Sequence, residues 1–120
     1  MKTENGGKQM KNVWRFSTPA TEEKQYGKHP TQKPTALIAR CLRATTDPGD
    51  LVLDPFTGSG STGVAAIKLG RHFVGCEQDK TYAQLAASRL TDAGGGGIEI
   101  DTGVSPSPAA QRQHGLFAKA

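Results

Sequence analysis

Residues 51–63 read Leu51-Val52-Leu53-Asp54-Pro55-Phe56-Thr57-Gly58-Ser59-Gly60-Ser61-Thr62-Gly63. The apolar start, the glycine-rich turn and the small residues that follow predict a buried strand, a loop and the beginning of a helix. A second short apolar run, residues 72–76, ends on Glu77. Parallel α/β units use this layout to hold a cofactor that contains a nucleoside. The glycines let the backbone approach the ligand, and the acid at the next strand end accepts hydrogen bonds from ribose hydroxyls.

Apolar spacing and turn residues predict further elements around this pair of strands. We expect helices from Pro34 through the apolar positions up to Leu42, over residues 61–69 and over residues 80–91. Short strands are expected over residues 13–16 and 97–100, and a turn over residues 47–50. The strand over residues 51–54 shows no apolar alternation, which is typical of a sheet that is covered on both faces.

These elements predict an α/β fold with a parallel sheet and flanking helices that is incomplete in this chain. The 120 residues are enough for one domain at most. We expect a polar, lysine-rich segment over residues 1–28, a binding unit over residues 29–92, and a Gly/Ser/Pro-rich tail without fixed structure over residues 93–120. A core drawn from about 60 central residues buries only about 60% of its extended-chain surface and is marginal on its own.

The glycine loop fits more than one kind of nucleotide site. Gly58, Gly60 and Gly63 also match the G-x-G-x-x-G pattern of dinucleotide-binding loops, which would predict NADH binding. That interpretation is disfavoured because a dinucleotide loop follows its apolar strand directly, whereas Asp54-Pro55-Phe56 intervenes here. A phosphate-binding G-x-x-x-x-G-K-[ST] loop is excluded, because valine and alanine follow Gly63 where lysine and a hydroxyl are required.

The net charge of +4 suits a polyanionic partner, although it is also an ordinary charge for solubility. Both cysteines, Cys41 and Cys76, occupy predicted apolar positions, which indicates reduced core residues of a cytoplasmic protein. The three histidines and two cysteines do not have metal-ligand spacing, so no metal site is expected. No secretory signal or membrane-spanning run is visible, and we expect no membrane association.

Three motifs occur in a recognisable order: His29-Pro30-Thr31-Gln32-Lys33-Pro34, the glycine loop with its Asp54-Pro55-Phe56 start, and Val74-Gly75-Cys76-Glu77. Over roughly residues 10–92, this order resembles the carboxyl-terminal half of the beta-class DNA amino-methyltransferases. The resemblance implies a partial Rossmann-like methyltransferase fold. It also implies methyl transfer from S-adenosylmethionine to adenine N6 or cytosine N4 in double-stranded DNA, as in restriction-modification systems.

The resemblance extends the candidate cofactor site beyond the glycines and Glu77. It implies that Asp54 lies near the methionine ammonium, Thr31 and Lys33 near the methionine carboxylate, and Gln78 or Asp79 near the adenine. Backbone N–H groups near Thr62 can receive a carboxylate. The whole expected set is Thr31, Lys33, Asp54, Phe56, Thr57, Gly58, Gly60, Thr62, Glu77 and Gln78.

Each of these residues also has a purely structural interpretation. Gly58 and Gly60 could only shape the turn, Glu77 could be an exposed strand-end acid, Thr31 could cap a helix, and Lys33 could be a solvated charge. His29, next to this set, is expected to be a structural loop residue.

In the resembling family, the target amine is held by an [Asp/Asn/Ser]-Pro-Pro-aromatic motif that precedes these segments. The sequence contains Asp47-Pro48-Gly49 and Asp54-Pro55-Phe56, and neither fits that motif. We therefore expect no catalytic residue in this chain and a second polypeptide or further half that carries the motif. The resemblance also implies that the target-recognition region is mostly or wholly absent, with residues 1–28 as its possible end. The alternative is a non-catalytic partner subunit that binds cofactor or DNA, or a gene remnant that is inactive alone.

Overall fold

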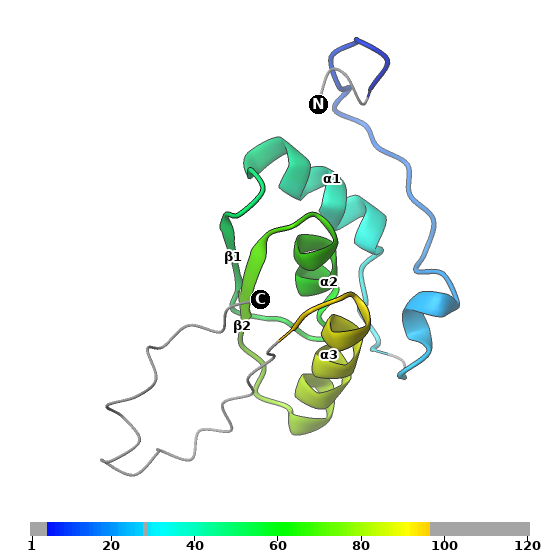
Figure 1. The fold of residues 1–120 in the computed structure, drawn as a ribbon. Helices are drawn as coiled ribbons and strands as arrows, with labels where there is room; N and C mark the ends of the chain where they lie inside the picture. The colour runs from blue at the N-terminus through cyan, green and yellow to red at the C-terminus, as the bar shows by residue number, and fades with distance from the viewer. Residues whose placement is uncertain (1–4, 28, 97–120) are drawn as a thin grey trace.

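The computed structural model describes residues 5–27 and 29–96. They form a two-stranded parallel sheet with helices on one side (Figure 1). The described elements are η2 (Glu22–Lys24), α1 (Thr35–Thr45), β1 (Leu51–Asp54), α2 (Ser61–Lys68), β2 (His72–Gly75) and α3 (Lys80–Asp92). This arrangement confirms the predicted α/β class and the predicted positions of the main elements. The expected strand over residues 97–100 and most of the expected tail lie outside the described residues.

The parallel pairing places the carboxyl ends of the two strands side by side. The register pairs Leu51 with His72 and Asp54 with Gly75. Beyond the last pair, the Cys76 N–H donates to the Asp54 carbonyl at 3.0 Å, and the Thr57 N–H donates to the Cys76 carbonyl at 2.9 Å. The loops that follow β1 and β2 are thereby fixed at the same edge of the sheet, where ligands bind in α/β folds.

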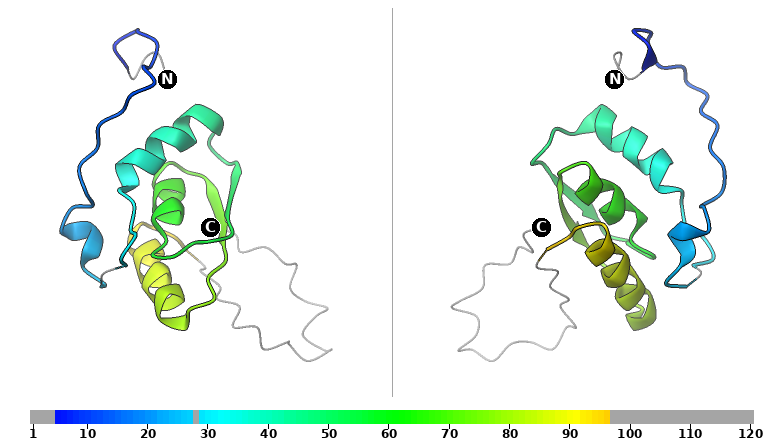
Figure 2. Two further views of the ribbon diagram at one scale, coloured as in Figure 1. Left: turned by 180° about the vertical axis from the view of Figure 1, so that it is seen from behind. Right: turned by 45° about the vertical axis from the view of Figure 1, so that its right-hand side comes forward.

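Helix α2 lies at the centre of the core. It contacts both strands as well as α1 and α3, and the helices lie on the same side of the strands in all three views (Figures 1 and 2). The small and branched side chains of α2 allow this close packing. The buried cluster consists of Leu42, Val52, Val64, Ala65, Ala66, Phe73 and Leu90.

The opposite face of the sheet is uncovered by the described residues. Val52 is 8% exposed, whereas Leu51 and Leu53 on either side of it are 53% and 64% exposed. The expectation of a sheet covered on both faces is therefore wrong for residues 5–27 and 29–96. Cys41 and Cys76 are also exposed rather than in the core. The reason is that α1 packs against α2 and, within the described part, no element covers the end of β2.

One prediction for the N-terminal part is wrong. Residues 13–16 are not a strand, because the described part offers them no neighbouring backbone. Trp14 instead lies under Arg40 of α1, with the guanidinium carbon 4.8 Å from the ring centre. The alternative in which Thr31 only caps a helix is not met at α1, since Pro34 occupies the position before the helix and makes no side-chain cap bond. No helix in residues 5–27 and 29–96 has the length and apolar character needed to cross a membrane.

Candidate functional site

Glu77 links the two loops that follow the parallel strands. Its Oε2 accepts a 2.9 Å hydrogen bond from the Gly58 N–H, and its Oε1 accepts one of 2.9 Å from the Asp79 N–H. An acid at the end of β2 therefore closes the glycine loop that follows β1. A carboxylate has about four lone-pair sites, so each oxygen can still accept from a ligand.

The backbone geometry of the loop requires glycine at two positions. Gly58 and Gly60 have φ values of 54° and 79°, in the left-handed region that favours glycine. A Cβ at Gly60 would lie 2.9 Å from the Ala86 Cβ of α3, and one at Gly58 would lie 3.2 Å from the His29 Nε2. The loop therefore needs these glycines to pack against α3 and His29, whether or not a ligand also approaches them.

The start of the loop is held by short-range hydrogen bonds. The Asp54 Oδ1 accepts from the Phe56 N–H at 3.0 Å, and the Thr57 hydroxyl donates to the Asp54 carbonyl at 3.0 Å. These bonds turn the chain sharply after β1 and leave the Phe56 side chain 88% exposed. Phe56 thus presents an apolar surface at the same edge of the sheet as Glu77.

The segment with the sequence His29 to Pro34 lies beside the glycine loop. The His29 ring packs on the Tyr82 ring with a centroid distance of 4.3 Å, and its Nδ1 accepts from the Thr31 N–H at 3.2 Å. The Lys33 Nζ donates to the Thr31 carbonyl at 3.2 Å. Thr31 and Lys33 are both exposed, so their side chains remain accessible next to the loop.

The structure thus gathers most of the predicted set at one edge of the sheet. The members on the β1 loop and the first turn of α2 are Asp54, Phe56, Thr57, Gly58, Gly60 and Thr62, and those after β2 are Glu77 and Gln78. The Gln78 side chain is exposed. Residues 5–27 and 29–96 contain no cluster of His, Cys, Asp and Glu that could hold a metal ion.

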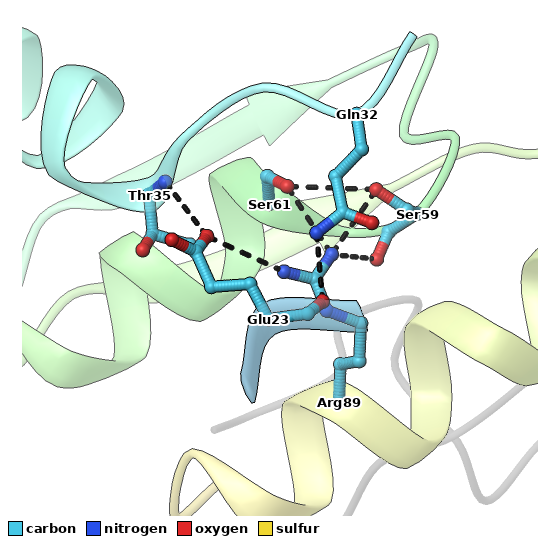
Figure 3. A network of polar contacts seen from close by, with 6 residues as sticks. All are labelled: Glu23, Gln32, Thr35, Ser59, Ser61 and Arg89. Carbon is cyan, nitrogen blue, oxygen red and sulfur yellow. Dashed lines mark hydrogen bonds and ion pairs between the residues drawn. The ribbon is translucent and has the colours of Figure 1, made fainter. Parts of the chain in front are cut away.

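A buried arginine beneath the glycine loop was not among the predicted site residues. Arg89 of α3 is 6% exposed, and its Nη1 donates to the Ser59 carbonyl at 2.6 Å, the Ser59 hydroxyl at 3.1 Å and the Ser61 hydroxyl at 3.2 Å (Figure 3). Burial lowers the pKa of Arg89, and Glu23 partly opposes that shift. The sequence signal for it was an arginine on the apolar stripe of a predicted helix, between Leu85 and Leu90.

Glu23 of η2 approaches the other side of the same guanidinium. Its Oε2 lies 3.9 Å from the Arg89 Nη2, within range of charge attraction but too far for a hydrogen bond. The same oxygen accepts from the Thr35 N–H at 3.0 Å, and the Glu23 carbonyl accepts from the Gln32 Nε2 at 2.7 Å (Figure 3). Glu23 thereby accepts the hydrogen bond from the first N–H group of α1.

The chain is similar to several DNA methyltransferases. A family model described as DNA methylase matches residues 1–88. Type II methyltransferase M2.DpnII of Streptococcus pneumoniae is 53% identical over 90 residues, which are 75% of this chain and 34% of that protein. M2.MboI of Moraxella bovis is 46% identical over 89 residues, which are 74% of this chain and 33% of that protein. The chain therefore spans about a third of the length of these curated relatives.

Two solved structures share the fold over most of the chain. The crystal structure of an M1.HpyAVI–SAM complex has a TM-score of 0.58 at 43% identity and covers 69% of this chain and 42% of that one. The PvuII DNA methyltransferase, described as cytosine-N4-specific, has a TM-score of 0.55 at 28% identity and covers 72% of this chain and 31% of that one.

Proposed function

The chain belongs to the DNA methylase family, and from this premise we propose that it is the S-adenosylmethionine-binding part of a site-specific DNA methyltransferase. The enzyme would methylate the exocyclic amine of adenine (N6) or cytosine (N4) in double-stranded DNA. One solved relative is a complex with S-adenosylmethionine, and another is specific for cytosine N4. Because this chain spans about a third of its curated relatives, the activity is proposed for an enzyme that includes further protein.

The hydrogen bond between the Gly58 N–H and the Glu77 carboxylate, 2.9 Å long, carries this proposal. It places a carboxylate that can accept further hydrogen bonds directly against the loop in which Gly58 and Gly60 have positive φ. Vicinal ribose hydroxyls present two donors side by side, which a carboxylate can accept together. The donor set at this edge therefore fits the nucleoside part of S-adenosylmethionine.

The remaining members of the set fit the other parts of the cofactor. Thr31 and Lys33, with the N-terminus of α2 near Thr62, would hold the methionine carboxylate, because an ammonium and free N–H groups both attract anions. Asp54 would face the methionine ammonium, and Phe56 and Gln78 would border the nucleoside. S-adenosylmethionine, when bound, supplies an electrophilic methyl group on a sulfonium.

We place the groups that hold the target amine outside these 120 residues, because the sequence contains no Pro-Pro-aromatic motif. A second polypeptide or a further part of the enzyme would supply them together with most of the DNA-recognition surface. The same absence supports a second candidate function, a partner subunit that binds cofactor or DNA without catalysing methyl transfer. Methylation of DNA by the purified chain alone would contradict the location of these groups outside the chain. It would also contradict the second candidate function.

Calorimetric titration with S-adenosylmethionine, and separately with NADH, tests the proposal. Removing the Phe56 side chain should weaken binding of S-adenosylmethionine by about 10- to 150-fold, since burial of an aromatic ring contributes about 1.5–3 kcal/mol. Phe56→Ala should leave folding unchanged because the ring is 88% exposed, and Val13→Ala, at a site 72% exposed, is the matched control. The proposal would be rejected if the folded chain did not bind S-adenosylmethionine or bound NADH more tightly.

A further inference from the structure

Arg89 and Glu23 connect the two loops of the proposed cofactor site from beneath. Arg89 is on α3 and holds the glycine loop, whereas Glu23 is on η2 and holds the segment that contains Lys33. We propose that Arg89 and Glu23 are positioning residues that keep the two loops in one relative arrangement. This inference rests on the proposed function only in one respect, namely that the arrangement of the two loops serves cofactor binding.

Arg89 restrains a loop whose backbone is otherwise permissive. Ser59 lies between Gly58 and Gly60, whose positive φ values allow conformations that other residues avoid. The Arg89 Nη1 donates to both the carbonyl and the hydroxyl of Ser59, and also to the Ser61 hydroxyl at the start of α2. One planar guanidinium therefore fixes the loop and the helix that follows it in a single geometry.

The burial of Arg89 argues for a role in specifying structure more than in adding stability. At 6% exposure its charge has lost most of its water, and the Nη2 has no hydrogen-bond partner in the described residues. A buried ion pair contributes little net stability, and replacing both of its partners by well-packed apolar side chains is often neutral. In some proteins, such groups instead select one arrangement among several compact ones.

Glu23 extends the restraint to the second loop. Its carboxylate oxygen accepts from the Thr35 N–H and attracts the Arg89 Nη2, and its carbonyl accepts from the Gln32 side chain. Gln32 and Thr35 flank Lys33 and Pro34, so the segment that carries Lys33 is held at both ends. In Figure 3 the Glu23 carboxylate lies between the Thr35 N–H and the guanidinium. A shift of Arg89 is therefore transmitted to Thr35 through Glu23.

A second buried arginine provides a matched control. Arg71 is 8% exposed and donates from its Nε to the Thr46 hydroxyl at 3.0 Å and from its Nη2 to the Thr46 carbonyl at 2.7 Å. It also donates to the Leu69 carbonyl. These contacts join the end of α1 to the turn before β2, and none involves a residue of the proposed cofactor site.

Amide hydrogen exchange of the whole 120-residue chain tests the inference without any ligand. The reporters are the Thr35 N–H, bonded to Glu23, the Gly60 N–H, bonded to Thr57, and the Cys76 N–H, bonded to Asp54 across the strand ends. In Arg89→Met we expect exchange at Thr35 and Gly60 to rise at least about tenfold more than at Cys76. The reason is that, without the guanidinium, the two loops can open locally while the strand ends stay paired. In Arg71→Met the three reporters should change together. Equal patterns in the two variants, or no excess at Thr35, would overturn the inference.

Two further variants keep the test decisive. Arg89→Lys preserves the charge and the apolar stem, but its side chain ends one bond short of the Nη1 that contacts Ser59 and Ser61. It should therefore show the same excess exchange at Gly60. Glu23→Gln keeps an acceptor for the Thr35 N–H and removes the attraction to Arg89, so it should raise exchange at Gly60. If Arg89→Lys fails to fold while Arg71→Lys folds, Arg89 is a general stability residue and the inference is rejected.

Binding of S-adenosylmethionine separates this inference from the proposed function. If the wild-type chain binds it, Arg89→Lys should raise the dissociation constant about tenfold while the folded fraction stays unchanged. A tenfold change in affinity is a usual size for coupling between sites. Unchanged affinity would reject the positioning role. If the folded wild-type chain does not bind it, the proposed function fails, and the exchange experiment still tests the link between the loops.

Discussion

Gly58 and Glu77 are joined by a hydrogen bond of 2.9 Å between the loop after β1 and the end of β2. The parallel register brings these two positions together, because Asp54 pairs with Gly75 and both strands end at the same edge. An acid that could serve a ligand thus also stabilises the loop against which that ligand would lie. Substitutions at Glu77 should therefore affect folding and binding at once.

Replacing Glu77 with alanine should lower the free energy of unfolding by about 2 kcal/mol, because two backbone N–H groups lose a charged acceptor. Urea denaturation measures this effect. Glu22→Ala, which removes an exposed acid from η2, is the control and should change stability by less than about 0.5 kcal/mol. A Glu77→Ala chain as stable as the control would show that the two hydrogen bonds do not hold the loop.

Replacing Gly60 with alanine should cost about 3 kcal/mol in unfolding free energy, since strain at a positive φ adds to overpacking. The new Cβ would lie 2.9 Å from the Ala86 Cβ. Gly94→Ala, with a φ of 95° and no atom within 4 Å of its Cβ, should show the strain alone. In Gly60→Ala, the further change Ala86→Gly should recover part of the loss. No recovery would mean that the packing against α3 is not the cause.

Replacing Asp79 with alanine should destabilise the chain by about 1 kcal/mol, the usual cost of losing an N-terminal helix cap. The Asp79 carboxylate accepts from the Thr81 and Tyr82 N–H groups at 2.8 and 3.1 Å. Asp79→Asn should retain most of the stability, because asparagine is also a good cap. Thermal unfolding of the two variants measures the difference, and equal losses would show that charge rather than capping dominates.

Tyr26 should ionise above its ordinary range in the folded chain. Its hydroxyl donates to the Asp92 carboxylate, and this bond, with burial and the nearby charge, raises the pKa of Tyr26 above 10.0. Since the folded-state pKa is raised, the stabilising effect is complete below pH 10.0 and is lost as the pH rises through the folded pKa. Absorbance titration of tyrosinate should show a late step that moves down in Asp92→Asn and vanishes in Tyr26→Phe. A late step that survives in Tyr26→Phe would contradict the assignment.

The sequence predicted local features well because local patterns determine them. Apolar runs located β1 and β2, turn residues located the loops, and the rule that parallel strands end together placed Glu77 near Gly58. Contacts between distant segments were not predictable in this way. The pairing of Glu23 with Arg89 spans most of the described chain, and nothing local to Glu23 distinguishes it from the neighbouring exposed acid.

The same limit explains the errors about burial. An apolar residue is buried only if another element covers it, and the composition of a strand does not show whether that element is present. Leu51, Leu53 and Cys76 read as core residues, yet in the described part of the chain they are exposed. Their exposure follows from a sheet that is covered on one face.

That uncovered face should make the isolated chain self-associate. Leu51 and Leu53 are 53% and 64% exposed on adjacent outward positions of β1, and exposed apolar surface of this kind promotes association. Leu53→Glu should shift the mass measured by light scattering towards that of the monomer. It should change the unfolding free energy by less than about 1 kcal/mol, because the side chain is already mostly in water. Val13→Glu, at an exposed apolar site away from the sheet, is the control. If both variants scatter like the wild type, the uncovered face does not drive association.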